Sequence, residues 1–587
     1  SQRCDLIPLE KGRMRLKYKK KGEDKFAELL TCNGQSFLFE GNTIKKLTDK
    51  IHDSNIKEVN DAVETQKAKK NVEINPEFKK ALEVMEHTSK NVFVTGKAGT
   101  GKSTLLNYFR SHTGKKVVVL APTGVAALNV KGETIHSFFR FKPDITLQKI
   151  KKISGKRTRI FKEIDAVIID EVSMVRADLL DCVDKFLRLN AADSKQPFGA
   201  IQMIFIGDLY QLPPVVTSRE KEIFRSHYQS QYFFDAAVFQ EFPMEFIELE
   251  KIYRQKDEKF IGLLNAIRNN SITDQDLSLL NRRVGADLTV DKNSGYMVHL
   301  STTNKTAAEI NAEHLNRLKT RIHTYSAKIE GDFKEYSYPT DSALRLAVRA
   351  QVMLLNNDTE GRWVNGSLGE ITQIKFNQEA SAESVFVRLA KGNIEEVLPF
   401  SWEIFHFSFD ETTSMINTET VGSFTQYPIK LAWAITIHKS QGKTFDRVIV
   451  DMGRGAFAHG QAYVALSRCR SFEGISLVRP LRKSDILMDR RIVQFVTNHQ
   501  YAISERNMPF EDKLEMIKEA IDNNIGLEIL YLKASDEKSR RLIRPQRVER
   551  MTYQDKEFIG LEAFCLSRGE NRVFRVDRIL EMKTVKE

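Results

Sequence analysis

The stretch GKAGTGKS at residues 96–103 constrains the fold of this chain more than any other feature. The apolar NVFVT before it predicts a strand, and STLLNYFR after it predicts a helix. Its glycines allow backbone N–H groups and the first helical turn to face a phosphate group. We therefore expect a strand, loop and helix that hold a nucleotide, with the amine of Lys102 on the β- and γ-phosphates and the hydroxyl of Ser103 on Mg²⁺. An ordinary glycine-rich turn is the alternative.

Short apolar segments alternate with helical stretches around this loop, which predicts a parallel sheet with helices on both faces. The pattern covers residues 71–235, typical of a P-loop NTPase core, with NVFVTG, KKVVVLAP, DAVIIDE and IQMIFIGD as strands. Residues 236–355 and 426–495 repeat it with VHLST, AQVML, AWAIT and DRVIVD, and predict a second lobe. Between these two parts, residues 356–425 are rich in turns and short strands, and predict an inserted small β-barrel. The fold class is therefore α/β.

The two ends of the chain have patterns of their own. Residues 1–70 predict a basic, β-rich module, because seven of the eleven residues from Lys11 to Lys21 are Lys or Arg and alternate with apolar ones. The dipeptide Asn33-Gly34 there is typical of a two-residue hairpin turn. A solvated basic tail is the alternative for the first 25 residues. Residues 508–587 begin with an amphipathic helix, continue with short basic strands, and predict a separate C-terminal domain.

Charge and cysteine usage narrow the class of protein. A net charge of +12 and a pI near 9.1 favour a polyanionic partner, because Lys and Arg neutralise phosphates and release counterions. The five cysteines stand singly, with no CxxC pair for zinc and no disulfide framework, which indicates a reducing compartment. No apolar run approaches the ~18 residues that span a bilayer, and the first residues lack the apolar core of a secretory signal. We expect a cytoplasmic protein, associated with the nucleoid if bacterial, and no membrane partner.

Two carboxylates follow a predicted buried strand. Asp170 and Glu171 end the segment AVIIDE, which places them at the carboxyl edge of the sheet beside the phosphate-binding loop. Asp170 suits the Mg²⁺ shell, and Glu171 suits polarisation of the attacking water. A surface acidic pair is the alternative. Farther on, IFIGDLYQLPP places Gln211 just beyond another strand, where its amide can sense the γ-phosphate.

Phosphoryl transfer also needs positive charge on the transferring group, and an arginine from a second lobe couples lobe closure to chemistry. Arg254 in KIYRQ and Arg468 in QAYVALSRCR are the two candidates. A surface salt bridge is the alternative for each of them.

In order along the chain, seven segments resemble the successive motifs of superfamily-one helicases of the Pif (petite integration frequency) type, which are relatives of the RecD group. The segments are GKAGTGKS, APTGVAALNVKGETIHSFFRF, DEVSM, PFGAIQMIFIGDLYQLPPV, YRQ, AITIHKSQGKTFDRVIVD and AYVALSRCRS. The likeness covers about residues 74–480. It implies two RecA-like lobes, with an SH3-like barrel as the insertion, and the use of ATP and Mg²⁺ to move 5′ to 3′ along single-stranded DNA.

The family is associated with unwinding of forked duplexes and of structured DNA such as G-quadruplexes, and with DNA repair, recombination and telomere maintenance. A monomer is expected. Carried over by position, the catalytic residues are Lys102, Glu171, Gln211, Arg254 and Arg468, and the metal ligands are Ser103 and Asp170. The resemblance implies these nucleotide contacts, with Tyr253 stacked on adenine: Gly96, Gly99, Thr100, Gly101, Lys102, Ser103, Thr104, Tyr253, Gln441 and Gly442.

The same resemblance implies a path for single-stranded DNA. Hydroxyl, imidazole and ammonium groups suit phosphate contacts, and an aromatic ring can stack a base for about 1–3 kcal/mol. The implied DNA-binding residues are Thr123, His136, Ser137, Phe138, Asn304, Thr436, His438 and Lys439. Packing in the core is the alternative for Phe138.

One position departs from the family pattern. Family members carry an adenine-reading glutamine before the phosphate-binding loop, and INPEFKKALEVM has Phe78 at that place. This departure puts selectivity for ATP over other nucleotides in question. Residues 137–160 interleave three phenylalanines with Lys and Arg and resemble the small wedge of these helicases, near the point where strands part. A basic surface loop is the alternative.

The C-terminal section, residues 508–587, resembles a WYL domain, a small β-barrel associated with nucleic-acid or ligand sensing. RRLIRPQRVERM and FIGLEAFCLSRGENRVFRVDRI carry this likeness, although residues 557–559 (EFI) stand where the naming Trp-Tyr-Leu would fall. A further nucleic-acid or ligand contact through this domain is implied. Four arginines there suit phosphate binding, with an exposed salt-bridged face as the alternative: Arg544, Arg572, Arg575 and Arg578.

Two other functions fit the same motifs. One is a translocase that strips proteins from DNA but unwinds poorly, which would leave a forked duplex intact. The other is a nucleotide-gated regulator whose basic C-terminal domain binds DNA or a signalling ligand. The regulator predicts ATP hydrolysis that is insensitive to single strands, whereas a helicase predicts strong stimulation that weakens with salt.

Overall fold

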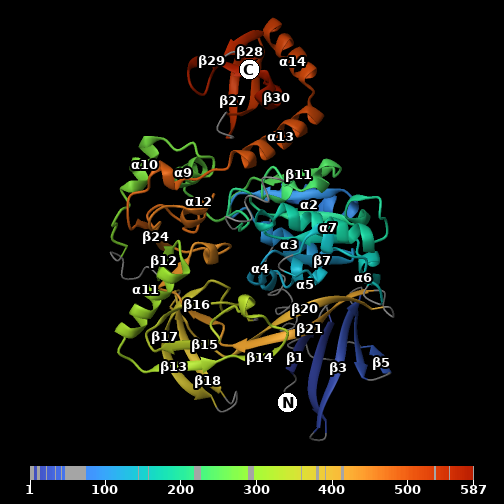
Figure 1. Cartoon of the computed structure of the whole chain (residues 1–587), viewed down its shortest axis with the longest axis vertical. Helices are drawn as coiled ribbons and strands as arrows, with labels where there is room; N and C mark the ends of the chain where they lie inside the picture. The colour runs from blue at the N-terminus through green and yellow to red at the C-terminus, as the bar shows by residue number, and fades with distance from the viewer. Residues whose placement is uncertain are drawn as a thin grey trace. The chain divides into compact units, whose positions relative to one another are not determined.

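The chain divides into two compact units, Ser1–Ile74 and Asn75–Glu587. The structure is a computed structural model (Figure 1). It describes five strands within the first 46 residues, and from residue 74 the ranges 74–142, 145–155, 158–216, 227–288, 296–358, 360–377, 382–390, 392–410, 415–533, 537–553 and 556–585.

The N-terminal unit contains one antiparallel sheet in the order β1-β2-β3-β4-β5. The predicted hairpin turn Asn33-Gly34 lies outside the described residues, but β3 and β4 on either side pair Cys32 with Gln35. The strands are β1 (Asp5–Leu9), β2 (Arg13–Lys20), β3 (Glu23–Cys32), β4 (Gln35–Glu40) and β5 (Thr43–Lys46).

The first lobe of the second unit is a six-stranded parallel sheet in the order β11-β6-β10-β9-β7-β8. Every residue of β9 and β10 is buried, as expected where both faces of a parallel sheet are covered. Its strands are β6 (Asn91–Gly96), β7 (Val117–Ala121), β8 (Glu133–Thr134), β9 (Ala166–Ile169), β10 (Gln202–Ile206) and β11 (Met244–Leu249). Its helices are α2 (Pro76–His87), α3 (Lys102–His112), α4 (Gly124–Asn129), α5 (Ile135–Phe139), α6 (Thr158–Glu163) and α7 (Ala177–Asn190).

The second lobe is a four-stranded parallel sheet in the order β23-β12-β24-β25. Its strands are β12 (Met297–Ser301), β23 (Ala434–Thr436), β24 (Arg447–Asp451) and β25 (Ile475–Leu477). Its helices are α9 (Glu258–Arg268), α10 (Asp274–Asn281), α11 (Asn304–Arg317) and α12 (Gln461–Leu466).

Two assignments made from the sequence are wrong. The predicted boundary at residue 236 gave β11 to the second lobe, but β11 pairs with β6 along its whole length in the first. The segment AQVML was predicted as a second-lobe strand, but β16 (Gln351–Leu354) pairs antiparallel with β17 (Leu368–Asn377) and β22 (Ile429–Leu431) in the insertion. A short apolar run shows that a strand exists but not which neighbour it pairs with.

The insertion between the halves of the second lobe consists of antiparallel sheets. One five-stranded sheet has the order β19-β18-β17-β16-β22, with a core of its own. A long hairpin of β20 and β21, with β14 on its edge, extends from it (Figure 1). The remaining strands are β13 (Ile322–Ser326), β14 (Lys328–Gly331), β15 (Ala343–Ala347), β17 (Leu368–Asn377), β18 (Ala382–Leu389), β19 (Ile394–Val397), β20 (Phe400–Asp410), β21 (Met415–Gln426) and β22 (Ile429–Leu431).

The C-terminal domain is an antiparallel sheet in the order β29-β28-β27-β26-β30, with a separate core. The helix α13 (Arg490–Asn507) connects the lobes to it (Figure 1). Its elements are α14 (Phe510–Asp522), β26 (Gly526–Leu532), β27 (Lys538–Tyr553), β28 (Lys556–Cys565), β29 (Glu570–Arg575) and β30 (Ile579–Val585).

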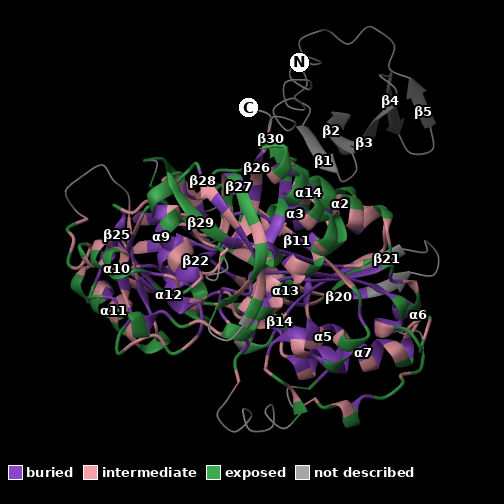
Figure 2. Ribbon diagram, turned by 90° about the horizontal axis from the view of Figure 1, so that it is seen from above, coloured by how far each residue is buried: buried purple, intermediate pink, exposed green. Residues whose placement is uncertain are grey.

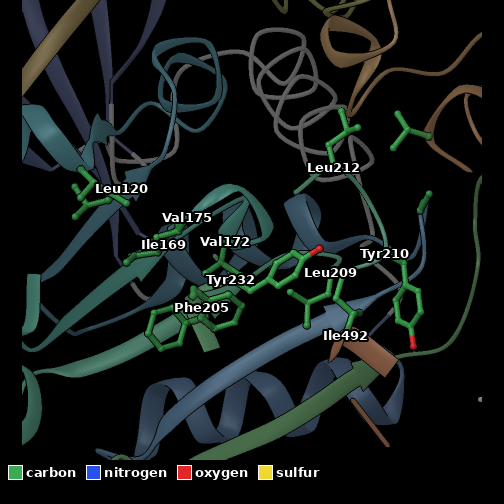
Figure 3. Close-up of a cluster of buried hydrophobic side chains, with 14 of the residues drawn as sticks. Leu120, Ile169, Val172, Val175, Phe205, Leu209, Tyr210, Leu212, Tyr232 and Ile492 are labelled. Carbon is green, nitrogen blue, oxygen red and sulfur yellow. The ribbon is translucent and has the colours of Figure 1, made fainter. Parts of the chain in front are cut away.

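The two lobes share one hydrophobic core, which also takes in α13. Buried residues run through the sheets of both lobes, and exposed residues cover the helices on the outside (Figure 2). Figure 3 shows part of this core, with Val172, Phe205 and Leu209 of the first lobe and Ile492 of α13. The lobes are therefore held in contact by apolar packing, and the candidate site lies along that contact.

Candidate nucleotide and DNA sites

The phosphate-binding loop follows β6 directly and ends where α3 begins. Gly99 and Gly101 have φ angles of +86° and +92°, which favour glycine. A Cβ on Gly99 would lie 2.5 Å from the Cβ of Arg254, so the loop has no room for a side chain there. The loop therefore presents backbone and the first turn of α3, where Ser103 and Thr104 are exposed.

Lys102 is the first residue of α3, and its Nζ donates to the carbonyls of Gly96 (2.7 Å) and Lys97 (3.1 Å). Burial lowers the pKa of Lys102, and the charges of Asp208 and Glu171 oppose this effect. The ammonium group thus lies at the loop with two carboxylates nearby, as the loop of a nucleotide site requires.

Asp170 and Glu171 follow β9 at the carboxyl edge of the sheet. Asp170 is 8% exposed, and Glu171 has a left-handed backbone with φ +49°. Burial raises the pKa of both carboxyl groups, and for Glu171 the neighbouring Asp170 adds to the effect while Lys102 opposes it. The surface acidic pair considered above is therefore excluded. No cluster of three or more His, Cys, Asp or Glu groups in the described ranges could hold a metal ion, but Mg²⁺ on a nucleotide needs only one or two carboxylates besides the phosphates.

Gln211 is buried, and its Nε2 donates to Asp208 Oδ2 at 3.2 Å. Asp208 is also paired with Arg268 of α9, with Oδ1 and Nη2 3.7 Å apart and both side chains buried. The Arg268 guanidinium lies 3.6 Å from the ring centre of Tyr210. The sequence did not single out Arg268, although it connects the second lobe to the residue that holds Gln211.

Both candidate arginine fingers lie at the loop. Arg254 packs against Gly99, and its Nη1 donates to the carbonyl of Ser467 at 3.2 Å. Arg468 is 1% exposed, donates to Val464 O and Ser467 Oγ at 2.8 Å, and has its pKa lowered by burial and by Arg254. Neither arginine forms an ion pair with a described residue, so the surface salt bridge is excluded for both. Of the two arginines, only Arg468 belongs to the second lobe. Arg254 follows β11 and belongs to the segment that leaves the first lobe.

A contact that the sequence did not reveal joins the loop to α12. The backbone N–H of Ala98 donates to the hydroxyl of Tyr463 at 3.0 Å. Tyr463 lies within AYVALSR, where its apolar neighbours made it look like core. Gly460, at the start of the same helix, leaves room for the carbonyls of Tyr210 and Gln211, since a Cβ there would lie 2.4 and 2.6 Å from them.

The residues expected near the nucleotide base differ in exposure. Tyr253 is 42% exposed, its N–H donates to Gly99 O at 2.9 Å, and its hydroxyl lies 3.5 Å from the amide of Asn75. Phe78 is 2% exposed and borders Gly101, so an apolar ring stands where a glutamine would face the base. From the second lobe, Gln441 Nε2 is buried without a hydrogen-bond partner among the described residues, and Gly442 has φ +74°. A buried donor without a partner can serve a polar ligand such as a phosphate group.

The predicted DNA contacts fall into two groups. In the first lobe, Thr123 caps α4 by accepting from Ala126 N (3.2 Å), and His136 and Ser137 are half-buried. In the second lobe, Asn304 and Lys439 are exposed, and Thr436 is buried. His438 stacks against Phe457, with ring centres 6.2 Å apart, and Phe457 is 64% exposed. Phe457 is thus an exposed ring that the sequence reading missed.

The structure corrects the prediction for Phe138. Its side chain is 1% exposed and packs edge-on against Phe139, Phe161 and Phe407, so it presents no face to a base. Phe139 and Phe141, the other phenylalanines of the predicted wedge at residues 137–160, are also buried. Packing in the core accounts for all three rings, because an aromatic run beside basic residues is equally compatible with a buried face.

Comparison with known proteins identifies the family. The model of the PIF1-like helicases matches residues 71–278. The ATP-dependent DNA helicase Pif1 of Bdellovibrio bacteriovorus is 31% identical over 440 residues, which cover 72% of this chain and 92% of that protein. The chain belongs to the PIF1-like helicase family. PIF1 of Mus musculus is 33% identical over 418 residues, covering 69% of this chain but 60% of the mouse protein.

Solved PIF1 structures support the fold class predicted above. Pif1 from Bacteroides sp. in complex with ADP-AlF4 aligns with a TM-score of 0.67 and 36% identity, over 73% of this chain and 98% of that chain. The Bacteroides Pif1 structure bound to single-stranded DNA aligns with a TM-score of 0.54 and 37% identity, over 73% and 97%. The α/β class with two RecA-like lobes is therefore confirmed.

Outside the PIF1-like region, a WYL-domain model matches residues 512–584, which confirms that part of the prediction. Two of the four arginines proposed there for phosphate binding are paired within the domain: Arg572 Nε with Glu570 (2.7 Å) and Arg575 Nη2 with Asp577 (2.6 Å). The salt-bridged alternative applies to these two. Within the described part of the chain, no helix has both the length and the apolar character needed to cross a bilayer.

Proposed function

We propose that this chain is an ATP-dependent DNA helicase that moves 5′ to 3′ along single-stranded DNA and separates duplex or structured DNA. One observation carries the proposal: the phosphate-binding loop is contacted from both sides of the lobe junction. Ala98 donates to Tyr463 of the second lobe, and Arg254 joins Gly99 to the carbonyl of Ser467. A change in the nucleotide therefore acts directly on the contact between lobes, which is how a motor couples hydrolysis to movement.

The residues at the loop have distinct proposed roles. Lys102 binds the β- and γ-phosphates, and Ser103 and Asp170 would hold Mg²⁺, which neutralises phosphate charge when bound. Glu171 orients the attacking water and accepts its proton, while Gln211 senses the γ-phosphate through its amide. The contacts of Gln211 with Asp208, and of Asp208 with Arg268, support transmission of that signal to the second lobe. Arg254 and Arg468 stabilise charge on the transferring group, and Tyr253 stacks on the base.

We further propose that single-stranded DNA runs across both lobes. A structure of Bacteroides Pif1 bound to single-stranded DNA and a structure of Pif1 helicases at forked duplex DNA support this partner. The first-lobe contacts are Thr123, His136 and Ser137. The second-lobe contacts are Asn304, Thr436, His438 and Lys439, with Phe457 as an added stacking ring beside His438. Alternating grip by the two groups would move the strand by one step per ATP.

We also propose a domain arrangement, an oligomeric state and a location for this chain. We infer a monomer with an SH3-like barrel as the insertion and a basic N-terminal module. Isolated cysteines and a DNA partner support the cytoplasm, or the nucleoid in a bacterium. The WYL domain is proposed to make a further nucleic-acid or ligand contact. Deletion of residues 508–587 should then lower the affinity for single-stranded DNA. If affinity, ATP hydrolysis and unwinding are all unchanged by the deletion, the proposed role of the WYL domain is wrong.

The test compares ATP hydrolysis with and without single-stranded DNA, and unwinding of a fluorescent fork with a 5′ tail against one with a 3′ tail. We expect strong stimulation that weakens with salt, and separation of the 5′-tailed fork alone. Lys102→Ala and Glu171→Gln should abolish turnover and largely spare DNA binding. Wild-type turnover in either variant contradicts the site. Stimulated hydrolysis with an intact fork indicates the protein-stripping translocase, and hydrolysis insensitive to DNA indicates the nucleotide-gated regulator.

A further inference from the structure

A lysine of the C-terminal domain reaches the first lobe close to the phosphate-binding loop. Lys538 is the first residue of β27, and its Nζ lies 2.8 Å from Glu248 Oε2 and 2.8 Å from Glu250 Oε1. The Lys538 and Glu248 side chains are 25% and 14% exposed, so water screens their pairing little, while Glu250 is 57% exposed. One ammonium group thus serves two carboxylates across the contact between the domain and the motor.

The two carboxylates flank the residue that backs the loop. Leu249 lies between them at the end of β11 and pairs with Gly96, the first glycine of the loop. The contact is close, because a Cβ on Gly96 would lie 2.6 Å from the carbonyl of Leu249. Any displacement of this strand end would therefore move the loop itself.

The charges also reach the loop and the lobe junction. Burial opposes ionisation of Glu248, yet the charges of Lys538, Arg268 and Lys97 hold its pKa below the ordinary value. Burial lowers the pKa of Lys97, a loop residue, with Arg268 adding to the effect and Glu248 and Glu250 opposing it. The charges of Lys538, Glu248 and Glu250 therefore act on Lys97 in the phosphate-binding loop.

The helix α13 fixes the domain to the same part of the first lobe. Phe495 stacks on Phe234 with ring centres 4.3 Å apart and also contacts Phe93 of β6. Gln500 donates to Glu248 Oε2 at 3.2 Å. At its other end, Ser504 donates to the carbonyl of Leu580 in β30 at 2.7 Å. The helix thus joins the strand before the loop to the C-terminal sheet.

We propose that Lys538 is a positioning residue of the nucleotide site, which neutralises Glu248 and Glu250 and so favours the triphosphate while the C-terminal domain is docked. This inference rests on the proposed function only in taking ATP as the ligand. Without Lys538, the two carboxylates behind the loop lose the ammonium group between them, and their negative charge repels the phosphates. A ligand that separated the C-terminal domain from the first lobe would weaken ATP binding in the same way. Ligand binding to this domain could therefore regulate the ATP affinity of the motor.

The test uses the full chain and measures the Kd of a fluorescent ATP analogue together with kcat and KM of DNA-stimulated hydrolysis. Lys538→Gln should raise Kd and KM roughly 3- to 20-fold with a smaller change in kcat, because repulsion between partly buried charges acts on the bound phosphates. Lys538→Arg should behave as wild type. Lys538→Gln combined with Glu248→Gln should return toward wild-type Kd, because the charge balance is restored while the new amide oxygen can still accept from Gln500. Arg540→Gln is the matched control, because the Arg540 pair with Glu581 lies wholly within the same domain.

The proposal is overturned by an unchanged Kd in Lys538→Gln, by an equal rise in Arg540→Gln, or by a double variant no better than the single one. The last result would mean that Lys538 only holds the domain in place. If Lys538→Gln does not fold, Glu250→Gln is the second test, because Glu250 is exposed and its substitution removes one negative charge behind the loop. This variant should bind the ATP analogue with a lower Kd than wild type. A Kd that is equal to or higher than that of wild type refutes the proposal. A wild-type chain without DNA-stimulated hydrolysis would sink the proposed function, whereas the Kd series would still report on Lys538.

Discussion

Two of the polar junctions between the first lobe and the rest of its compact unit are built from different chemistry. At the nucleotide junction, Asp208 pairs with Arg268 of the second lobe, and the two side chains are 0% and 5% exposed. Arginine stays protonated at any pH that the fold survives. The cation of this junction, Arg268, therefore keeps its charge over the pH range in which the protein is folded.

At the hairpin junction, the carboxylate of Glu133 in β8 is fully buried and accepts from the ring of His406 in β20 at 2.9 Å. It also accepts from the backbone N–H of Phe407. His406 is 27% exposed, and its ring titrates near neutral pH. The cation of the hairpin junction thus titrates near neutral pH, whereas the cation of the nucleotide junction does not.

The largest effect should come from breaking the nucleotide junction with Arg268→Gln. The change leaves Asp208 as an uncompensated buried charge and removes the group over the Tyr210 ring, so we expect a loss of about 3–5 kcal/mol in the first unfolding transition. DNA-stimulated kcat should fall at least about tenfold, since Gln211 depends on Asp208 for its position. Chemical denaturation and steady-state hydrolysis measure the two quantities.

Arg479→Gln provides the control for this prediction. Arg479 pairs with the buried Asp485 in the second lobe at 2.8 Å, so its loss should lower stability but leave kcat unchanged. If both variants lose kcat in proportion to stability, Arg268 has no role at the site and the contrast between the junctions fails.

A smaller effect should follow Tyr463→Phe, which sharpens the comparison by removing one hydrogen bond from the same junction. The N–H of Ala98 then loses its partner inside the protein, at a cost of about 1–3 kcal/mol. Because that N–H belongs to the phosphate-binding loop, we expect KM for ATP to rise about five- to tenfold. Tyr325→Phe, which removes a hydroxyl bonded to Glu383 in the insertion, should leave this KM unchanged. Equal KM values in all three proteins would separate Tyr463 from nucleotide binding.

The parts of the site that the sequence predicted are those made by neighbours along the chain. The loop at residues 96–103 and the pair Asp170 and Glu171 each follow a buried strand, so the strand pattern alone places them at one sheet edge. Their residue types then identify the chemistry. The family and the α/β class followed from the same local motifs.

The parts that the sequence did not predict depend on partners far along the chain. Arg268 stands in the helix segment GLLNAIR, where an arginine is usually exposed, and only the packing of α9 against Asp208 reveals its role. Lys538 lies 288 and more residues from its partners. Phe138 shows the converse, because an aromatic residue beside basic ones looked available for a base and is instead buried by Phe407 of the hairpin.

The smallest effect concerns the hairpin junction and its pH dependence. The pKa of His406 is raised above 6.5, chiefly by its hydrogen bond to Glu133 and by the charge of that carboxylate. Asp332 also raises this pKa, whereas burial and the charge of Arg140 lower it. A raised pKa means that the folded state binds the proton more tightly than the unfolded state. The stability that this proton contributes is therefore fully present below pH 6.5 and is lost as the pH rises through the raised folded value.

We expect the difference in unfolding free energy between wild type and His406→Gln to be about 1 kcal/mol at pH 6 and to shrink toward zero as the pH rises past the raised folded pKa. Glutamine keeps a donor for Glu133 but does not titrate, so it isolates the contribution of the proton. Thermal melts across this pH range measure the difference, with His314→Gln as a control outside the junction. A difference that stays constant with pH would mean that the ring acts only as a neutral donor. The hairpin junction would then have no cation that titrates near neutral pH, like the junction of Arg268, and the contrast between the two junctions would rest on burial alone.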